Sequence, residues 1–138
     1  MKWIKIEDAT PEQLEEVINA VKEIFPNFAP DAEVSCEVDP RYFTVEHMNV
    51  LKAGGCNRLS FGVQDLDEEV QKTIHRIQPF ELTQNVINIA RDAGIHSVNT
   101  DLIYGLPHQT RESFKKTLEK MLILNTDRFA VFNYAHVP

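Results

Sequence analysis

The stretch HSVNTDLIY, residues 96–104, decides the fold because it is a β-prone run enclosed between two helical stretches. The helical pattern before it covers residues 80–93 and is closed by Gly94, and Thr110 opens the helix that follows. A strand between two helices is typical of folds in which helices connect neighbouring parallel strands. We therefore expect an α/β fold.

The same alternation extends towards both ends of the chain. Thr10 and Gln13 form a capping box that predicts a helix, Thr44 opens a second helix that stops at Gly54, and Asp67 starts a short third one. The predicted helix after Thr110 runs to about residue 124. Strands are expected at residues 33–38, 57–63, 96–104 and 128–134.

Four parallel strands with helical connections are compatible with two architectures. One is a small open, doubly wound sheet, and the other is about half of a (β/α)₈ barrel, which typically needs about 250 residues. The chain has 138 residues, begins with a helix and ends on a strand. We expect a single partial barrel domain over residues 1–138, truncated at both ends. Such a half barrel leaves strand edges uncovered, so the isolated chain is expected to self-associate.

Composition restricts the class of protein. Lys and Arg number 14 and Asp and Glu number 21, so the net charge is −7, which argues against a nucleic-acid partner. The sequence has no apolar run of about 18 residues and no signal-peptide pattern at its N-terminus. Its two cysteines, Cys36 and Cys56, cannot form a disulfide framework. We expect a cytoplasmic protein without a membrane segment.

Polar side chains gather at the ends of the predicted strands, where parallel α/β proteins place their sites. Glu37 and Asp101 lie inside otherwise apolar strands, which favours a functional role because burying a polar group is costly. Asp39, Asp65 and Asp67 are equally well explained as turn formers and helix caps. The remaining polar residues of these strands are Gln64, Asn99, Tyr104, Asn133, Tyr134 and His136.

Two arginines are candidates for pairing with carboxylates. Arg58 and Arg76 could each bind a carboxylate through two parallel hydrogen bonds, and each could equally be a surface or helix-end charge. None of the five histidines has the spacing of metal ligands, so no metal site is predicted. The sequence contains neither GxGxxG nor GxxxxGK[ST], so a phosphate-binding loop is not expected.

Four strand-end segments together resemble a known family. They are EVDPR (37–41), NRLSFGVQD (57–65), DLIYGLP (101–107) and FNYAHVP (132–138). In this order and spacing they resemble the oxygen-independent coproporphyrinogen III oxidases of heme biosynthesis, which are radical S-adenosylmethionine enzymes. The resemblance extends over nearly the whole chain, from about Pro11.

The resemblance implies a barrel that binds a [4Fe-4S] cluster and S-adenosylmethionine. It implies an enzyme that removes two propionate carboxylates from coproporphyrinogen III and leaves vinyl groups, using a 5′-deoxyadenosyl radical. By that resemblance Glu37 would contact the cluster-bound S-adenosylmethionine. Gln64, Arg76, Asp101 and the backbone of Ala135 would contact a second S-adenosylmethionine, or the substrate in that space. The resemblance does not identify the partner that exchanges electrons with the enzyme.

The chain departs from the family at the cluster. The family binds it through CxxxCxxC, whereas this chain has only Cys36 and Cys56, so we expect the chain alone to be inactive. One alternative is a segment of the related heme chaperones, which typically carry Asn-Pro in place of Asp39-Pro40 and Gln-Ser in place of Gln64-Asp65, and lack the ending at 133–136. The other alternative is a repurposed, non-catalytic binding module.

Overall fold

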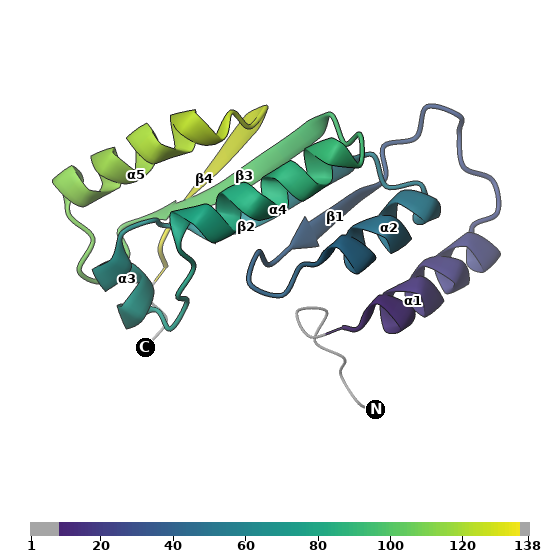
Figure 1. Cartoon of the computed structure of the whole chain (residues 1–138), viewed down its shortest axis with the longest axis horizontal. Coiled ribbons are helices and arrows are strands. Elements are labelled where there is room, and N and C mark those ends of the chain that lie inside the picture. Colours follow the sequence, from purple (N-terminus) through teal and green to yellow (C-terminus); the bar gives the residue numbers. More distant parts are fainter. Residues whose placement is uncertain (1–8, 136–138) are drawn as a thin grey trace.

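Four parallel strands form a single sheet in the order β1-β2-β3-β4 (Figure 1). The structure is a computed structural model that describes residues 9–135, so His136, one of the polar residues at the predicted strand ends, lies outside the described part. The strands are β1 (Ser35–Val38), β2 (Arg58–Gln64), β3 (Ser97–Tyr104) and β4 (Arg128–Asn133). All four predicted strands are confirmed, with ends that differ by no more than a few residues.

Five helices precede and connect these strands in the part of the chain from residue 9 to 135, and two of them lie between β2 and β3. They are α1 (Pro11–Ile24), α2 (Val45–Gly54), α3 (Glu68–Thr73), α4 (Phe80–Asp92) and α5 (Arg111–Leu124). No helix in this described part combines the length and apolar character that a membrane crossing needs.

The helix ends are determined by local side chains. Thr10, Thr44 and Thr110 each form a complete capping box at the start of α1, α2 and α5. Asp67 caps α3 by accepting hydrogen bonds from two backbone amides of its first turn. Gly55 ends α2 with a left-handed φ of 93°, a conformation that costs glycine little.

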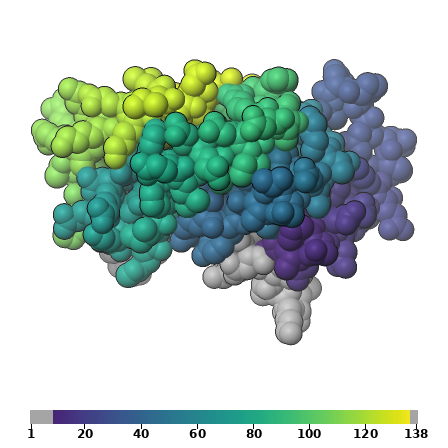
Figure 2. Space-filling model, in the orientation of Figure 1, coloured from purple at the N-terminus to yellow at the C-terminus, as the bar shows by residue number. Residues whose placement is uncertain are grey.

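The connectivity decides between the two architectures. Each strand pairs with the next one in the sequence, so the sheet never reverses its direction of growth. Helices α2, α4 and α5 cover the same face of the sheet (Figures 1 and 2). A doubly wound sheet carries helices on both faces, whereas a (β/α) barrel carries them only outside. The chain therefore forms a partial (β/α) barrel wall with four parallel strands and covering helices, as expected.

The core lies between the sheet and its helices. Apolar side chains of the strands, such as Leu59, Phe61 and Leu102, are fully buried against residues such as Met48 and Met121 of the helices. Because side chains alternate along a strand, the residues between these apolar ones point to the opposite face. That face carries the polar side chains of the strands, which places the candidate site.

Candidate functional site

A cavity of about 360 Å³ opens at the carboxyl ends of β1 and β2. Among its lining residues are three of the five predicted site residues, Glu37, Gln64 and Arg76. Glu37 belongs to β1, Gln64 ends β2, and Arg76 follows α3, so three separate elements bring these side chains together. A carboxylate, an amide and a guanidinium around one cavity can bind a ligand with both acidic and hydrogen-bonding groups.

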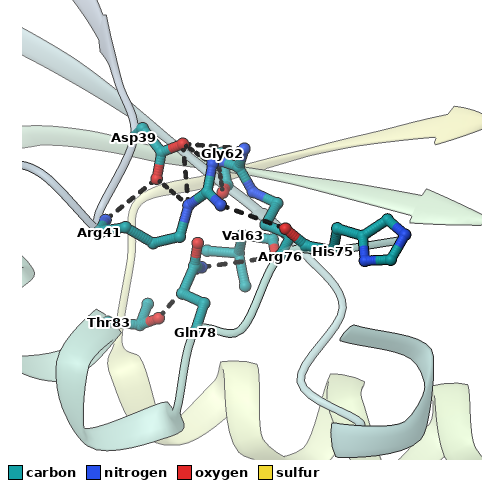
Figure 3. A network of polar contacts seen from close by, with 8 residues as sticks. All are labelled: Asp39, Arg41, Gly62, Val63, His75, Arg76, Gln78 and Thr83. Carbon is teal, nitrogen blue, oxygen red and sulfur yellow. Dashed lines mark hydrogen bonds and ion pairs between the residues drawn. The ribbon is translucent and has the colours of Figure 1, made fainter. Parts of the chain in front are cut away.

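Arg76 turns towards the sheet and is mostly buried. Its Nη2 donates to the Gly62 carbonyl at 2.9 Å, and its Nη1 lies 2.9 Å from Oδ2 of Asp39 (Figure 3). The side chain is 18% exposed. Of the two interpretations left open for Arg76, the structure therefore favours pairing with a carboxylate over a solvated charge at a helix end.

Asp39 is the centre of an ion-pair cluster. Besides Arg76, it accepts hydrogen bonds from Arg41, at 2.6 Å from Nη2 to Oδ2 and 3.0 Å from Nε to Oδ1. Burial opposes ionisation of this carboxyl, but the hydrogen bonds from Arg41 and the charges of both arginines outweigh burial and lower its pKa. Asp39 also accepts from the Arg41 amide, as a turn former does. The turn-forming role is real, but it is only part of what Asp39 does.

Asp101 is held in a second polar cluster, on the face of the sheet opposite helices α2, α4 and α5. Its Oδ1 accepts from Nδ2 of Asn99 at 2.7 Å, and its Oδ2 accepts from the Ser60 hydroxyl at 2.8 Å. Asn99 also donates to Ser60 at 2.7 Å. In the strand register Asp101 lies opposite Gly62, which lines the cavity, so this carboxylate lies next to the cavity without lining it.

Gln64 and Ala135 occupy different surroundings. Gln64 has a left-handed φ of 66°, where the pairing of β2 with β3 shifts register, and its side chain reaches back over Gly62. Ala135 follows β4, is exposed, and is not among the residues that line the cavity. The predicted site residues thus lie towards the carboxyl ends of the strands, where Glu37, Gln64 and Arg76 line the cavity and Asp101 and Ala135 do not.

Asp65 has a structural role in a buried network. It is fully buried, and its carboxylate accepts from the Thr117 hydroxyl and from Nε2 of Gln109, both at 2.5 Å. It also accepts from the amide of Asp67 at 2.8 Å. These contacts connect the end of β2 to the β3–α5 loop and to α5, which agrees with the structural interpretation of this residue.

Ser60 and Gly62 belong to the site but were not singled out from the sequence, whereas Asn99 was among the polar strand residues considered there. Asn99 lies two residues before Asp101 and so points to the same face. Finding Ser60 and Gly62 required the register between β2 and β3, which the sequence alone does not provide. The Arg58 guanidinium pairs with the exposed Glu33, at 2.6 Å, and Arg58 is not among the residues that line the cavity.

The described residues do not fit a [4Fe-4S] cluster. Between residues 9 and 135 there is no group of three or more His, Cys, Asp or Glu side chains that could hold a metal. Burial, together with the nearby Cys56 and Glu37, raises the pKa of the Cys36 thiol to about 11, which disfavours the thiolate that a cluster needs. Cys36 is instead packed against the core as a small apolar residue.

Comparison with known proteins identifies the family. The family model for the radical SAM superfamily matches residues 6–121. The oxygen-independent coproporphyrinogen III oxidase of Helicobacter pylori is 64% identical over 129 residues, which are 94% of this chain and 28% of that relative. The chain thus spans less than a third of the relative's length.

Solved structures agree with this assignment. The coproporphyrinogen III oxidase of Escherichia coli, described as a radical SAM enzyme, matches with a TM-score of 0.88 and 47% identity, over 94% of this chain and 30% of that one. A radical S-adenosylmethionine methyltransferase of Kitasatospora setae matches with a TM-score of 0.69 at 18% identity, over 88% of this chain and 23% of that one, and shares the fold. This chain belongs to the radical SAM superfamily.

Proposed function

We propose that the chain is part of the catalytic barrel of an oxygen-independent coproporphyrinogen III oxidase. The enzyme oxidatively decarboxylates two propionates of coproporphyrinogen III to vinyl groups, giving protoporphyrinogen IX, and works in the cytoplasm. Support comes from the 64% identity to the Helicobacter pylori oxidase and the 47% identity to the Escherichia coli oxidase. The observation that carries the proposal is the cavity where Glu37, Gln64 and Arg76 meet at the strand ends.

The side chains around this cavity have the chemistry that S-adenosylmethionine requires. Glu37 is an acceptor for amine or hydroxyl groups of one molecule. Gln64 and Asp101 offer partners for the ribose or amino-acid part of a second molecule, and Arg76 for a carboxylate of that molecule or of a substrate propionate. We assign the backbone of Ala135, which follows β4, to the same second molecule.

The [4Fe-4S] cluster of the family is assigned to a part of the enzyme other than this chain. Three thiolates close together on one loop are needed to hold it and leave one iron open, and this chain has two separated cysteines. The isolated chain is therefore expected to be inactive, and its role is to bind and orient S-adenosylmethionine and substrate.

A hybrid enzyme tests the proposed function. In it this chain replaces the aligned 129-residue segment of the Helicobacter pylori oxidase, and anaerobic conversion of coproporphyrinogen III is measured. We expect activity in the hybrid, and a loss of about 100-fold in kcat/KM for Glu37→Gln or Arg76→Gln, because each removes a charged contact. Glu16→Gln and Arg111→Gln change exposed residues in the same way and are expected to have no effect.

Two results would contradict the proposal. The first is a hybrid that carries its cluster and cleaves S-adenosylmethionine but does not convert coproporphyrinogen III. The second is a hybrid that binds heme tightly without turnover, which would instead favour the related heme chaperones.

A further inference from the structure

One carboxylate, that of Asp39, is shared by two arginines at the edge of the cavity (Figure 3). Oδ2 of Asp39 lies 2.6 Å from Nη2 of Arg41 and 2.9 Å from Nη1 of Arg76. The Asp39 side chain is only 5% exposed, and those of Arg41 and Arg76 are 22% and 18% exposed. The cluster therefore holds two positive charges and one negative charge in a largely dehydrated place.

Arg41 keeps the Asp39 carboxylate in a single orientation. Its guanidinium contacts both carboxylate oxygens, through Nε and Nη2, and its backbone amide donates to Oδ1 at 3.0 Å. The Arg41 guanidinium is itself placed over the ring of Tyr42, 5.1 Å from the ring centre, and donates to the carbonyl of His75 at 3.4 Å. The carboxylate that Arg76 meets is therefore pre-oriented.

Arg76 needs this carboxylate to stay at the cavity. The Gly62 carbonyl, which accepts from its Nη2, is neutral and cannot balance the charge of a guanidinium that is largely removed from water. Without the negative charge of Asp39, the two guanidinium groups would repel each other across a short distance. The long arginine side chain would then turn towards solvent, where hydration is better.

We propose that Asp39 is a positioning residue that holds the Arg76 guanidinium at the cavity. The ligand that Arg76 then meets is the one given by the proposed function, on which this part of the inference rests. Both carboxylate oxygens of Asp39 already contact arginine side chains, so Asp39 acts on the ligand through Arg76.

The position of Arg76 can be measured without any activity. The 138-residue chain is treated with p-hydroxyphenylglyoxal, and the modification rate of each arginine is read by peptide mass spectrometry, with the exposed Arg111 as the reference. We expect Asp39→Asn to raise the rate at Arg76 several-fold and leave Arg91 unchanged. Asp39→Glu, which keeps the charge, is expected to give a smaller increase.

Asp127→Asn is the matched control. Asp127 pairs with Arg91 at 2.8 Å in a separate and more exposed ion pair, so this variant should raise the rate at Arg91 and not at Arg76. An unchanged rate at Arg76 in Asp39→Asn would overturn the proposal. If the modification rates of Arg76 and Arg91 rise together in both variants, the proposal is overturned too, because such a result would show a general loosening of the fold.

A double-mutant cycle in the hybrid enzyme separates this inference from the proposed function. Asp39→Asn is expected to raise KM for S-adenosylmethionine or substrate about ten-fold, with a smaller change in kcat. In the Arg76→Gln background the same change should add less than about two-fold, because Asp39 acts through Arg76.

The cycle and the labelling give different answers if different parts are wrong. If Asp39→Asn raises the modification rate of Arg76 but leaves KM unchanged, the positioning role of Asp39 is supported and the proposed ligand of Arg76 is contradicted. Independent, multiplying effects of the two substitutions on KM would contradict the positioning role.

Discussion

Gly62 lets two side chains of the site approach the same point of the sheet. A Cβ added at this position would lie 3.0 Å from Nε2 of Gln64 and 3.2 Å from Nη2 of Arg76. Both atoms are the far ends of flexible side chains, so they can move at little cost. We expect Gly62→Ala to change the free energy of unfolding by less than about 1 kcal/mol, and yet to weaken ligand binding at the cavity because both ends are displaced.

Gly54→Ala is the matched control for this substitution. The atoms nearest to its added Cβ would belong to the Ile18 side chain, at 3.0 Å, away from the cavity. Urea unfolding of the chain and KM of the hybrid enzyme measure the two effects. A large loss of stability in Gly62→Ala, or equal KM effects of the two substitutions, would show that Gly62 does not serve the site.

The chemical identity of the site residues could be predicted, but their partners could not. Glu37 and Asp101 stand out because each is charged within an apolar strand, and both lie at the expected end of the sheet. The pairing of Arg76 with Asp39 joins positions 37 residues apart in the sequence, and depends on how the chain turns back after α3. No local pattern encodes such a contact.

The network around Asp65 joins β2 to α5. The Thr117 hydroxyl donates to Asp65 and accepts from the amide of Leu66 at 3.2 Å, and all these groups are buried. Thr117→Val keeps the shape of the side chain but removes both hydrogen bonds. We expect it to lower the free energy of unfolding by about 2 kcal/mol, since it leaves a buried amide and a buried carboxylate each without one partner.

A shift of the urea midpoint at constant m-value measures this cost. Thr73→Val, on the exposed side of α3, removes a hydroxyl that donates to the Glu69 carbonyl within the same helix, and is expected to change stability by less than about 0.5 kcal/mol. A Thr117→Val variant as stable as this control would mean that the network does not hold α5 to the sheet.

The helices and strands could be predicted almost completely because their signals are local. Thr10, Thr44, Asp67 and Thr110 begin helices through side chains that cap amides two or three residues away. The short apolar strands depend on alternation within a few residues. The largest difference from the predicted strand ends is in β1, which begins at Ser35, two residues later than predicted.

The choice between a barrel wall and a doubly wound sheet could not be made from these signals. It depends on which face each connecting helix covers, and every such helix has an apolar side that would fit either face. Only the consecutive order of the strands, with α2, α4 and α5 on one side, resolves it. Which face the helices cover depends on how all the strand–helix units wind together.

Within residues 9–135, one edge of the sheet is the apolar strand β4, which has a strand neighbour on one side only. It pairs only with β3, and Phe129, Val131 and Phe132 are 43%, 49% and 54% exposed. Unpaired backbone groups beside apolar side chains are a template for pairing with another chain. We expect the isolated chain to self-associate through β4, with a mass that rises with protein concentration in light scattering coupled to size-exclusion chromatography.

Phe132→Lys should reduce this association, because a charge on an edge strand opposes pairing with a second copy. Ile24→Lys is the control, since Ile24 is even more exposed, at 69%, but lies on α1, away from the edge of β4. Equal effects of the two substitutions would attribute association to apolar surface in general. A monomer at every concentration would show that β4 does not pair with a second copy of the chain, and that its edge is shielded within one copy.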